Sequence, residues 1–309
     1  MVTLNDGTTT HINPLNGIVE NNFRYHRLGS FIGIHAVFFS SYILFAYCIL
    51  LIQYFLRNAN MGLKYHIMYL VGLMFLAVMI FLLQSIVISA SFVLLTFLIL
   101  LYFAYLRTKR VKTLTISLMT IILIGTIFSI NIYNKLDSKD NPFYYDMSLR
   151  PDRIDRDESN WNPMNIRLAI WENSLEVIGD HWLLGVGPAN MTEVLDSYYG
   201  KNNFVFGSLD HLNSHNQFLH SFIVLGICGF VVLLLLVFSL TRDSIKRKDL
   251  VMASLLTIFV LFSLTASTLS VNKGIMFFSF FFSLLIYMEP RAMEVLDSSP
   301  DNTIGKENN

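Results

Sequence analysis

The sequence predicts an all-α, polytopic membrane protein with about seven transmembrane helices and one large external loop that carries short helices. The composition is the first reason. Of 309 residues, 54% are hydrophobic and 14% are charged, and the mean hydropathy is +0.53, whereas a soluble domain of this length carries about 25% charged residues. The net charge is zero, so no nucleic-acid partner is expected; membrane lipids are the expected surroundings.

The second reason is a series of apolar runs that approach the roughly 20 residues a helix needs to cross the hydrocarbon core. None contains Asp, Glu, Lys or Arg, as the cost of a charge inside a bilayer requires. Only Gln84-Ser85 separates the second run from the third, which predicts a tight hairpin. The runs cover residues 31–56, 66–84, 86–106, 113–133, 216–240, 250–270 and 274–288. Cys48 and Cys228 lie inside such runs, and we expect both to be buried free thiols.

Basic residues in the short loops set the expected orientation. By the positive-inside rule these loops are cytoplasmic, and the long segment after the fourth run is outside. This segment contains 13 acidic and seven basic residues. The basic residues are Arg57, Lys64, Arg107, Lys109, Arg110, Lys112, Arg242, Lys246, Arg247 and Lys248. The expected divisions are an external N-terminal segment (1–28), four transmembrane helices (29–133), a large periplasmic loop (134–214), three transmembrane helices (215–288) and a disordered cytoplasmic tail (289–309).

The external loop holds all three tryptophans and four of the seven prolines, so we expect it to fold into a small cap. Within it, "NPMNIRLAIWENSLEVIG" predicts a helix with Asn162 as N-cap and Pro163 first, ending at Gly179. Its apolar stripe is Ile166, Ile170, Trp171, Leu175 and Ile178. The following "LLGVGPANM" predicts a turn in which Gly185 and Gly187 supply backbone freedom.

Three histidines cluster where the loop meets the fifth run, in "HLNSHNQFLHSFIVLGICGF". His215 is either an ordinary residue at a helix start or a proton-exchanging group. His211 and His215 have the i, i+4 spacing of a metal-binding pair, but the zinc-protease glutamate and a third ligand are missing, so no metal site is expected. Gly226 and Gly229 are typical of close helix packing.

Arg167 and the "RPDRIDRDES" stretch also have two interpretations each. Arg167 is either a surface arginine paired with an acid or a functional cation. Asp155-Arg156-Asp157 has the form of a metal-binding motif of nucleotide-sugar enzymes, but that chemistry needs a nucleotide-binding domain, so a local salt-bridge cluster is favoured. Arg150, Arg153 and Arg156 remain an alternative site for a phosphate.

Taken in order, these features resemble the O-antigen ligase and polymerase superfamily, which are membrane glycosyltransferases of bacterial envelopes. The resemblance rests on Arg167 with "LAIW", on "LLGVGPAN", and on His215-Asn216, followed after nine residues by Gly226 and two residues later by Gly229. The resemblance covers roughly residues 24–288. Within this range, "RYHRLGSF" resembles the family's external loop that carries an arginine. Arg27 is the preferred match to that arginine, and Arg24 is the second choice.

The resemblance implies transfer of a glycan from undecaprenyl diphosphate to an acceptor hydroxyl, at a periplasmic active site on the bacterial inner membrane, with no metal or other cofactor. His215 is then the catalytic base and Arg167 the catalytic cation. The implied substrate-binding residues are Arg27, Arg24, Asn216 and His211, and the structural glycines are Gly185, Gly187, Gly226 and Gly229.

Three other functions stay open beside a ligase whose acceptor is lipid A–core. These are a polymerase that extends another glycan repeat, a polytopic permease, and an inactive fragment. Three spans after the loop favour the ligase, and uncharged spans count against the permease. The ligases have more spans before the loop, and residues 1–28 carry no secretory signal pattern, so we expect N-terminal helices to be missing from this chain.

Overall fold

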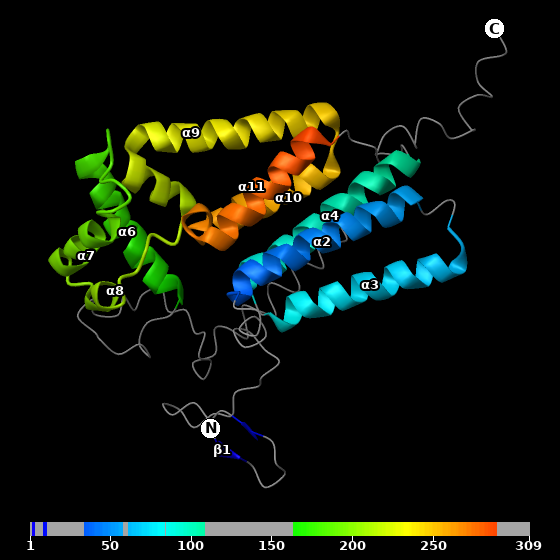
Figure 1. Cartoon of the computed structure of the whole chain (residues 1–309), viewed down its shortest axis with the longest axis horizontal. Coiled ribbons are helices and arrows are strands. Elements are labelled where there is room, and N and C mark those ends of the chain that lie inside the picture. The colour runs from blue at the N-terminus through cyan, green and yellow to red at the C-terminus, as the bar shows by residue number, and fades with distance from the viewer. Residues whose placement is uncertain are drawn as a thin grey trace. The chain divides into compact units, whose positions relative to one another are not determined.

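The computed structural model describes residues 2–3, 9–10, 34–57, 61–83, 85–108 and 163–288 (Figure 1). The chain divides into two compact units, residues 1–95 and 96–309. The fold is helical, which confirms the predicted class. A short ladder in the first unit was not predicted: β1 (Val2–Thr3) pairs antiparallel with β2 (Thr9–Thr10).

The first unit contains α2 (Ala36–Arg57), α3 (Leu63–Leu82) and the beginning of α4 (Ile86–Thr108). α2 packs along α3, and the Tyr47 ring of α2 lies 4.8 Å from the Phe92 ring of α4. Three residues separate α3 from α4, in keeping with the short connection predicted between the second and third runs. Cys48 is buried, as predicted.

In the second unit, α6 (Pro163–His181), α7 (Met191–Lys201) and α8 (Val205–Leu209) form the cap. α6 begins at Pro163 as predicted but continues two residues past Gly179. The helices share one apolar core, whose buried members include Ile170, Val177, Leu195, Tyr199, Phe204, Ile223 and Val224. Leu175, a member of the predicted apolar stripe, does not pack in this core, because its side chain is 58% exposed.

The same unit continues with α9 (Gln217–Arg247), α10 (Leu250–Ser263), the 3-10 helix η3 (Thr268–Ser270) and α11 (Asn272–Tyr287). Among the described helices, α2, α3, α4 and α9 are long and apolar enough to cross a membrane, whereas α10 and α11 have 14 and 16 residues. The run predicted over 250–270 is interrupted where Ser263 and Thr268 share a side-chain hydrogen bond of 2.7 Å, since such side chains compete with helix formation. The run predicted over 113–133 lies outside the described residues.

Hydrogen bonds show that α10 and α11 run between the two ends of α9. Near the start of α9, the side-chain oxygen of Gln217 accepts from the backbone N–H of Leu269 in η3 (2.6 Å). At its far end, Arg247 donates to the carbonyl of Ile286 in α11 (2.9 Å) and to that of Met288. The three helices therefore pass through one layer (Figure 1).

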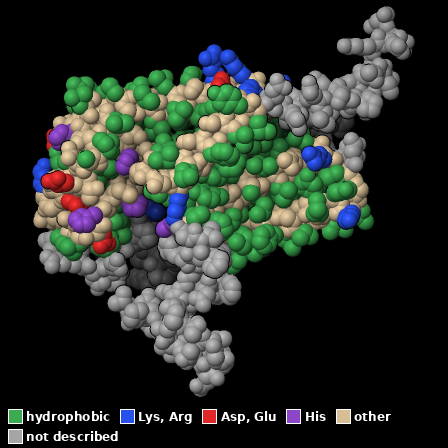
Figure 2. Space-filling view, viewed as in Figure 1, with side chains coloured by type: hydrophobic (Ala, Val, Ile, Leu, Met, Phe, Trp, Pro, Cys, Tyr) green, Lys and Arg blue, Asp and Glu red, His purple; other side chains and the backbone are tan. Residues whose placement is uncertain are grey.

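Polar and apolar side chains separate along this second unit. Figure 2 shows acidic and histidine side chains over α6–α8 and hydrophobic side chains over α9–α11. Cys228 on α9 is exposed, so its predicted burial was wrong. The basic residues Arg242, Lys246, Arg247 and Lys248 lie at the end of α9 that is remote from the cap. This arrangement is that of a membrane layer with a polar cap at one face.

Candidate functional site

A short loop between α8 and α9 (residues 210–216, the histidine loop) carries His215 in an uncommon backbone conformation. His211 and His215 both have positive φ angles, 50° and 42°, which side chains with a Cβ seldom adopt. The side chain of Asn213 accepts a hydrogen bond from the backbone N–H of His215 (2.9 Å) and holds this conformation. Strained residues of this kind cluster at functional sites, so the loop is a candidate site on geometry alone.

Asn216 forms the N-cap of α9 directly after His215. Its side-chain oxygen accepts from the backbone N–H groups of Phe218 (2.9 Å) and Leu219 (3.2 Å), which satisfies donors that a helix start leaves unpaired. The cap fixes where α9 begins, and so fixes the position of His215. Since the oxygen is engaged, a contact from Asn216 to a substrate falls to its Nδ2 group.

The structure brings His215 and Arg167 together, although 48 residues separate them. Arg167 lies in the second turn of α6, which packs against α9. Burial lowers the pKa of His215 below its ordinary value of 6.5, and the positive charge of Arg167 lowers it further. His215 is therefore uncharged at neutral pH and is able to accept a proton.

The cap holds the histidine loop through α7. Tyr199, which is fully buried, donates a hydrogen bond from its hydroxyl to the carbonyl of Leu212 (3.0 Å). Burial and the neighbouring Asp196 raise the pKa of Tyr199, so the hydroxyl remains a donor. His211 pairs through its Nδ1 with Asp196 and is largely exposed. Its ring is thus engaged by an acidic side chain of α7.

The start of α9 is also fixed from η3, by contacts that the sequence did not suggest. Gln217 is buried; it accepts from Leu269 and donates from Nε2 to the hydroxyl of Ser221 (3.0 Å). The hydroxyls of Ser214 and Ser267 lie 3.3 Å apart. The polar run "SLTASTLS" inside an apolar stretch was the available signal for these contacts.

The predicted turn around Gly185 and Gly187 (residues 182–187, the glycine turn) forms hydrogen bonds with α9 at a point where that helix is broken. Gly226 has φ 63° and ψ −159°, so the helix is interrupted there. In a continuous helix the carbonyl of Ile223 would accept from the N–H of Ile227. Instead Ile223 accepts from Val186 (2.8 Å), and Ile227 donates to the carbonyl of Trp182 (2.8 Å). A third bond joins Gly187 N–H to the Val224 carbonyl (2.9 Å). Residues 182–187 thereby pair the groups that the break leaves open.

Gly185 and Gly226 permit this contact because neither has a side chain. A Cβ on Gly185 would lie 2.6 Å from Gly226 N, and a Cβ on Gly226 would lie 2.3 Å from the carbonyl oxygen of Leu183. Gly229 has a different neighbour: its Cβ would lie 2.2 Å from the Cβ of Leu225 on the same helix. The predicted close packing at Gly226 and Gly229 is therefore present, but not against a second helix. Gly226 packs against the turn, and Gly229 packs against Leu225 of its own helix.

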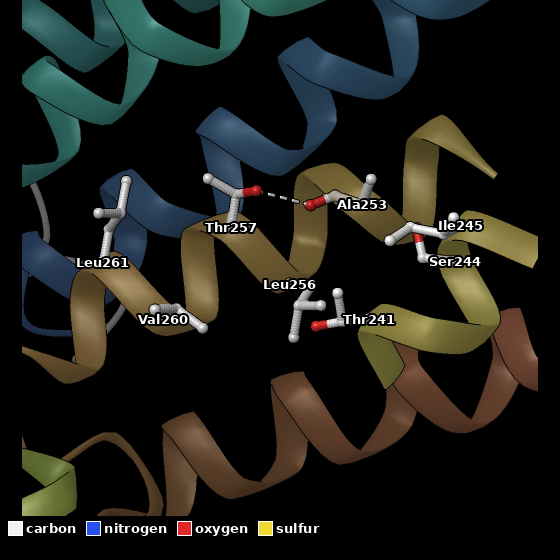
Figure 3. Close-up of a pocket in the computed structure, with 8 residues that line it drawn as sticks. All are labelled: Thr241, Ser244, Ile245, Ala253, Leu256, Thr257, Val260 and Leu261. Carbon is white, nitrogen blue, oxygen red and sulfur yellow. Dashed lines mark hydrogen bonds between the residues drawn. The ribbon is translucent and has the colours of Figure 1, made fainter. Parts of the chain in front are cut away.

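Two hollows lie elsewhere in the second unit. One, of about 310 Å³, lies between α9 and α10 near the basic end of α9 (Figure 3), where Thr257 donates to the carbonyl of Ala253 (2.8 Å). The other, of about 580 Å³, lies beside the glycine turn and has both polar and apolar walls; it is lined by His181, Val186, Asn190, Glu193, Val194 and Ser197. The first is too far along α9 from His215 to belong to the candidate site.

Several predicted residues lie outside the described part of the chain. They are Arg24 and Arg27, and also the Arg150, Arg153, Arg156 and Asp155–Asp157 alternatives. The described site therefore consists of His215, Arg167 and Asn216, with His211 paired to α7.

Comparison with known proteins identifies a family. A model of the family described as O-antigen ligase matches residues 69–234, which is more than half of the chain. The matched range contains α6, the glycine turn, the histidine loop and the break in α9. No curated protein matches the chain. The length of the match, together with membrane-spanning helices, shows that this chain belongs to the O-antigen ligase family.

Proposed function

We propose that this chain transfers a glycan from undecaprenyl diphosphate to an acceptor hydroxyl at the outer face of the bacterial inner membrane. The observation that carries the proposal is the position of a half-buried histidine, whose pKa is lowered by burial and by Arg167, at the start of a membrane span. Family membership supports a membrane enzyme of the O-antigen ligase or polymerase type.

His215 is the proposed general base. A sugar hydroxyl is a weak nucleophile, and a histidine held in its neutral form takes the proton as the oxygen attacks. The bond from the anomeric carbon to the diphosphate breaks, its electron pair leaves with the lipid diphosphate, and the acceptor oxygen forms the new glycosidic bond. The proton resides on His215 until it passes to solvent.

Arg167 is proposed to offset the negative charge that develops on the departing diphosphate. An arginine is always charged and presents forked donors that match phosphate oxygens. We expect Arg27, and secondarily Arg24, to contribute further charge, and His211 and Asn216 to contact the sugars. With arginines in this role, the reaction is proposed to need no metal ion.

The orientation proposed for the cap is periplasmic. Basic residues gather at the end of α9 remote from the cap, and positive charge favours the cytoplasmic side. A donor on the outer face must be lipid-linked, since nucleotide sugars are cytoplasmic. For the acceptor we propose lipid A–core, as in a ligase; a growing glycan, as in a polymerase, is the alternative.

A reconstituted assay tests the proposal. The purified chain in lipid vesicles receives lipid-diphosphate glycan and acceptor, and glycan transfer is measured for wild type, His215→Ala and His181→Ala. Loss of a general base lowers the rate by roughly 10²–10⁴-fold. His181 is exposed at the end of α6 and serves as the matched histidine control.

Each outcome is informative. Transfer that requires His215 but not His181 supports the proposal, and the preferred acceptor separates a ligase from a polymerase. Absence of transfer by wild type, or equal rates in His215→Ala and wild type, contradicts it. Solute or lipid flux across the vesicles without transfer indicates the permease instead.

A further inference from the structure

The turn that closes the break in α9 leaves three consecutive apolar side chains uncovered within the described residues. Trp182, Leu183 and Leu184 are 55%, 52% and 79% exposed. The backbone of the same turn forms hydrogen bonds with α9 and α6 through Trp182, Gly185, Val186 and Gly187. The turn is therefore fixed in place while its side chains point away from the protein.

The hydrogen bonds place this turn at the break in α9. It bonds to Ile223 and Val224 before Gly226 and to Ile227 after it. The turn therefore lies beside the point where the second, strongly apolar part of α9 begins.

The neighbouring surface of α9 is apolar at this level and beyond. Leu225 is 53% exposed and Val232 65% exposed. On α6, Leu175 (58%) and Leu168 (42%) precede Trp182 at intervals of seven residues and so lie on one side of the helix, but the exposed Glu172 lies between them. The apolar surface therefore consists of the turn and the exposed side of α9.

We propose that residues 182–184 enter the hydrocarbon of the outer leaflet and contact lipid acyl chains. The occupant of the surface is lipid because the surface is continuous with a membrane span and has no charged residue at its tip. A broken helix is tolerated at membrane depth only where other protein groups pair its backbone, and this turn supplies the pairing. Tryptophan is also the side chain most typical of the boundary between headgroups and hydrocarbon. The proposal does not depend on the transfer reaction.

Spin labelling of the full chain in lipid nanodiscs tests this contact. The background carries Cys228→Ser, because Cys228 is exposed, whereas Cys48 is buried. A label at Leu184→Cys is compared with Val232→Cys on α9 as the lipid reference and with Glu193→Cys on α7 as the water reference. The measured quantity is the ratio of collision rates with oxygen, which concentrates in hydrocarbon, and with a water-soluble nickel complex.

The expected ratio at position 184 is close to that at 232 and several-fold above that at 193. A ratio close to that at 193 places the turn in water and overturns the proposal. A label shielded from both reagents shows that protein, from this chain or another, covers the turn, and this also overturns it. Leu183→Cys, at 52% exposure, repeats the measurement should Leu184→Cys fold poorly.

Discussion

Replacing Gly226 by alanine tests whether the break in α9 depends on the absence of a side chain. Its φ of 63° with ψ of −159° belongs to a region occupied almost only by glycine. The added Cβ would also lie 2.3 Å from the carbonyl oxygen of Leu183, a backbone atom that cannot rotate away. Gly226→Ala therefore causes backbone strain at the break and also forces α9 and the turn apart.

The size of the effect follows from these two contributions. Backbone strain at such a position costs about 1–3 kcal/mol. Separation loses the three hydrogen bonds made by Val186, Gly187 and Ile227, each worth about 0.5–1.5 kcal/mol. Together they lower the free energy of unfolding by roughly 2.5–7.5 kcal/mol.

Two glycines provide graded controls. A Cβ on Gly187 meets nothing within 4 Å, but its φ is 82°, so Gly187→Ala suffers strain alone and should lose about 1–3 kcal/mol. A Cβ on Gly179 meets nothing and the residue is helical, so Gly179→Ala should gain about 0.4–1 kcal/mol. Unfolding in detergent micelles, followed by circular dichroism, measures all three, and hydrogen exchange reports the amides of residues 186, 187 and 227.

The predicted order of stability is Gly179→Ala above wild type, then Gly187→Ala, then Gly226→Ala. If Gly226→Ala unfolds with the same free energy as Gly187→Ala, the contact with Leu183 does not matter. If it matches Gly179→Ala and keeps the three amides protected, the assigned break is itself wrong.

Three further changes test the site. Burial and Arg167 hold the pKa of His215 below 6.5, so the loss of transfer rate on the acid side of the pH profile should have its midpoint below that value. Arg167→Gln should move this midpoint to higher pH, and Arg167→Lys should not. An unchanged midpoint in Arg167→Gln would disprove the charge effect. Asn216→Ala removes the cap of α9 and should cost about 0.5–2 kcal/mol in unfolding free energy, which Asn216→Asp should largely retain; equal losses in both would argue against capping. Gln217→Leu deprives the Leu269 N–H of its acceptor and should cost about 1–3 kcal/mol with faster exchange of that amide, so unchanged exchange would count against this contact.

The long spans were predictable because hydropathy over 20 residues dominates their placement. α2, α3, α4 and α9 follow from apolar runs alone. The interruption after α10 was visible locally as "SLTASTLS", but averaging over a long apolar window concealed it. The start of α6 at Pro163 was predictable, since proline fits the first helical position.

The break at Gly226 could not be predicted from its own neighbourhood. A glycine in an apolar run usually indicates close packing, and the groups that pair the break come from residues 182–187, far upstream. The exposure of Leu175 and of Cys228 was not predictable for a related reason: helical periodicity identifies an apolar face but does not distinguish a face packed on protein from one left open. The proximity of Arg167 and His215 was expected only through the family resemblance, because it depends on how α6 packs against α9.

The shared core of cap and span imposes an order on biosynthesis. Ile223 and Val224 of α9 belong to the apolar core of α6–α8, and the glycine turn finds its hydrogen-bond partners on α9. The ribosome completes α6–α8 before it has made α9, so the cap emerges without part of its own interior. We therefore expect the cap to acquire its final packing only after the segment from Gln217 onward has entered the bilayer, so that membrane insertion becomes a step in the folding of the polar domain.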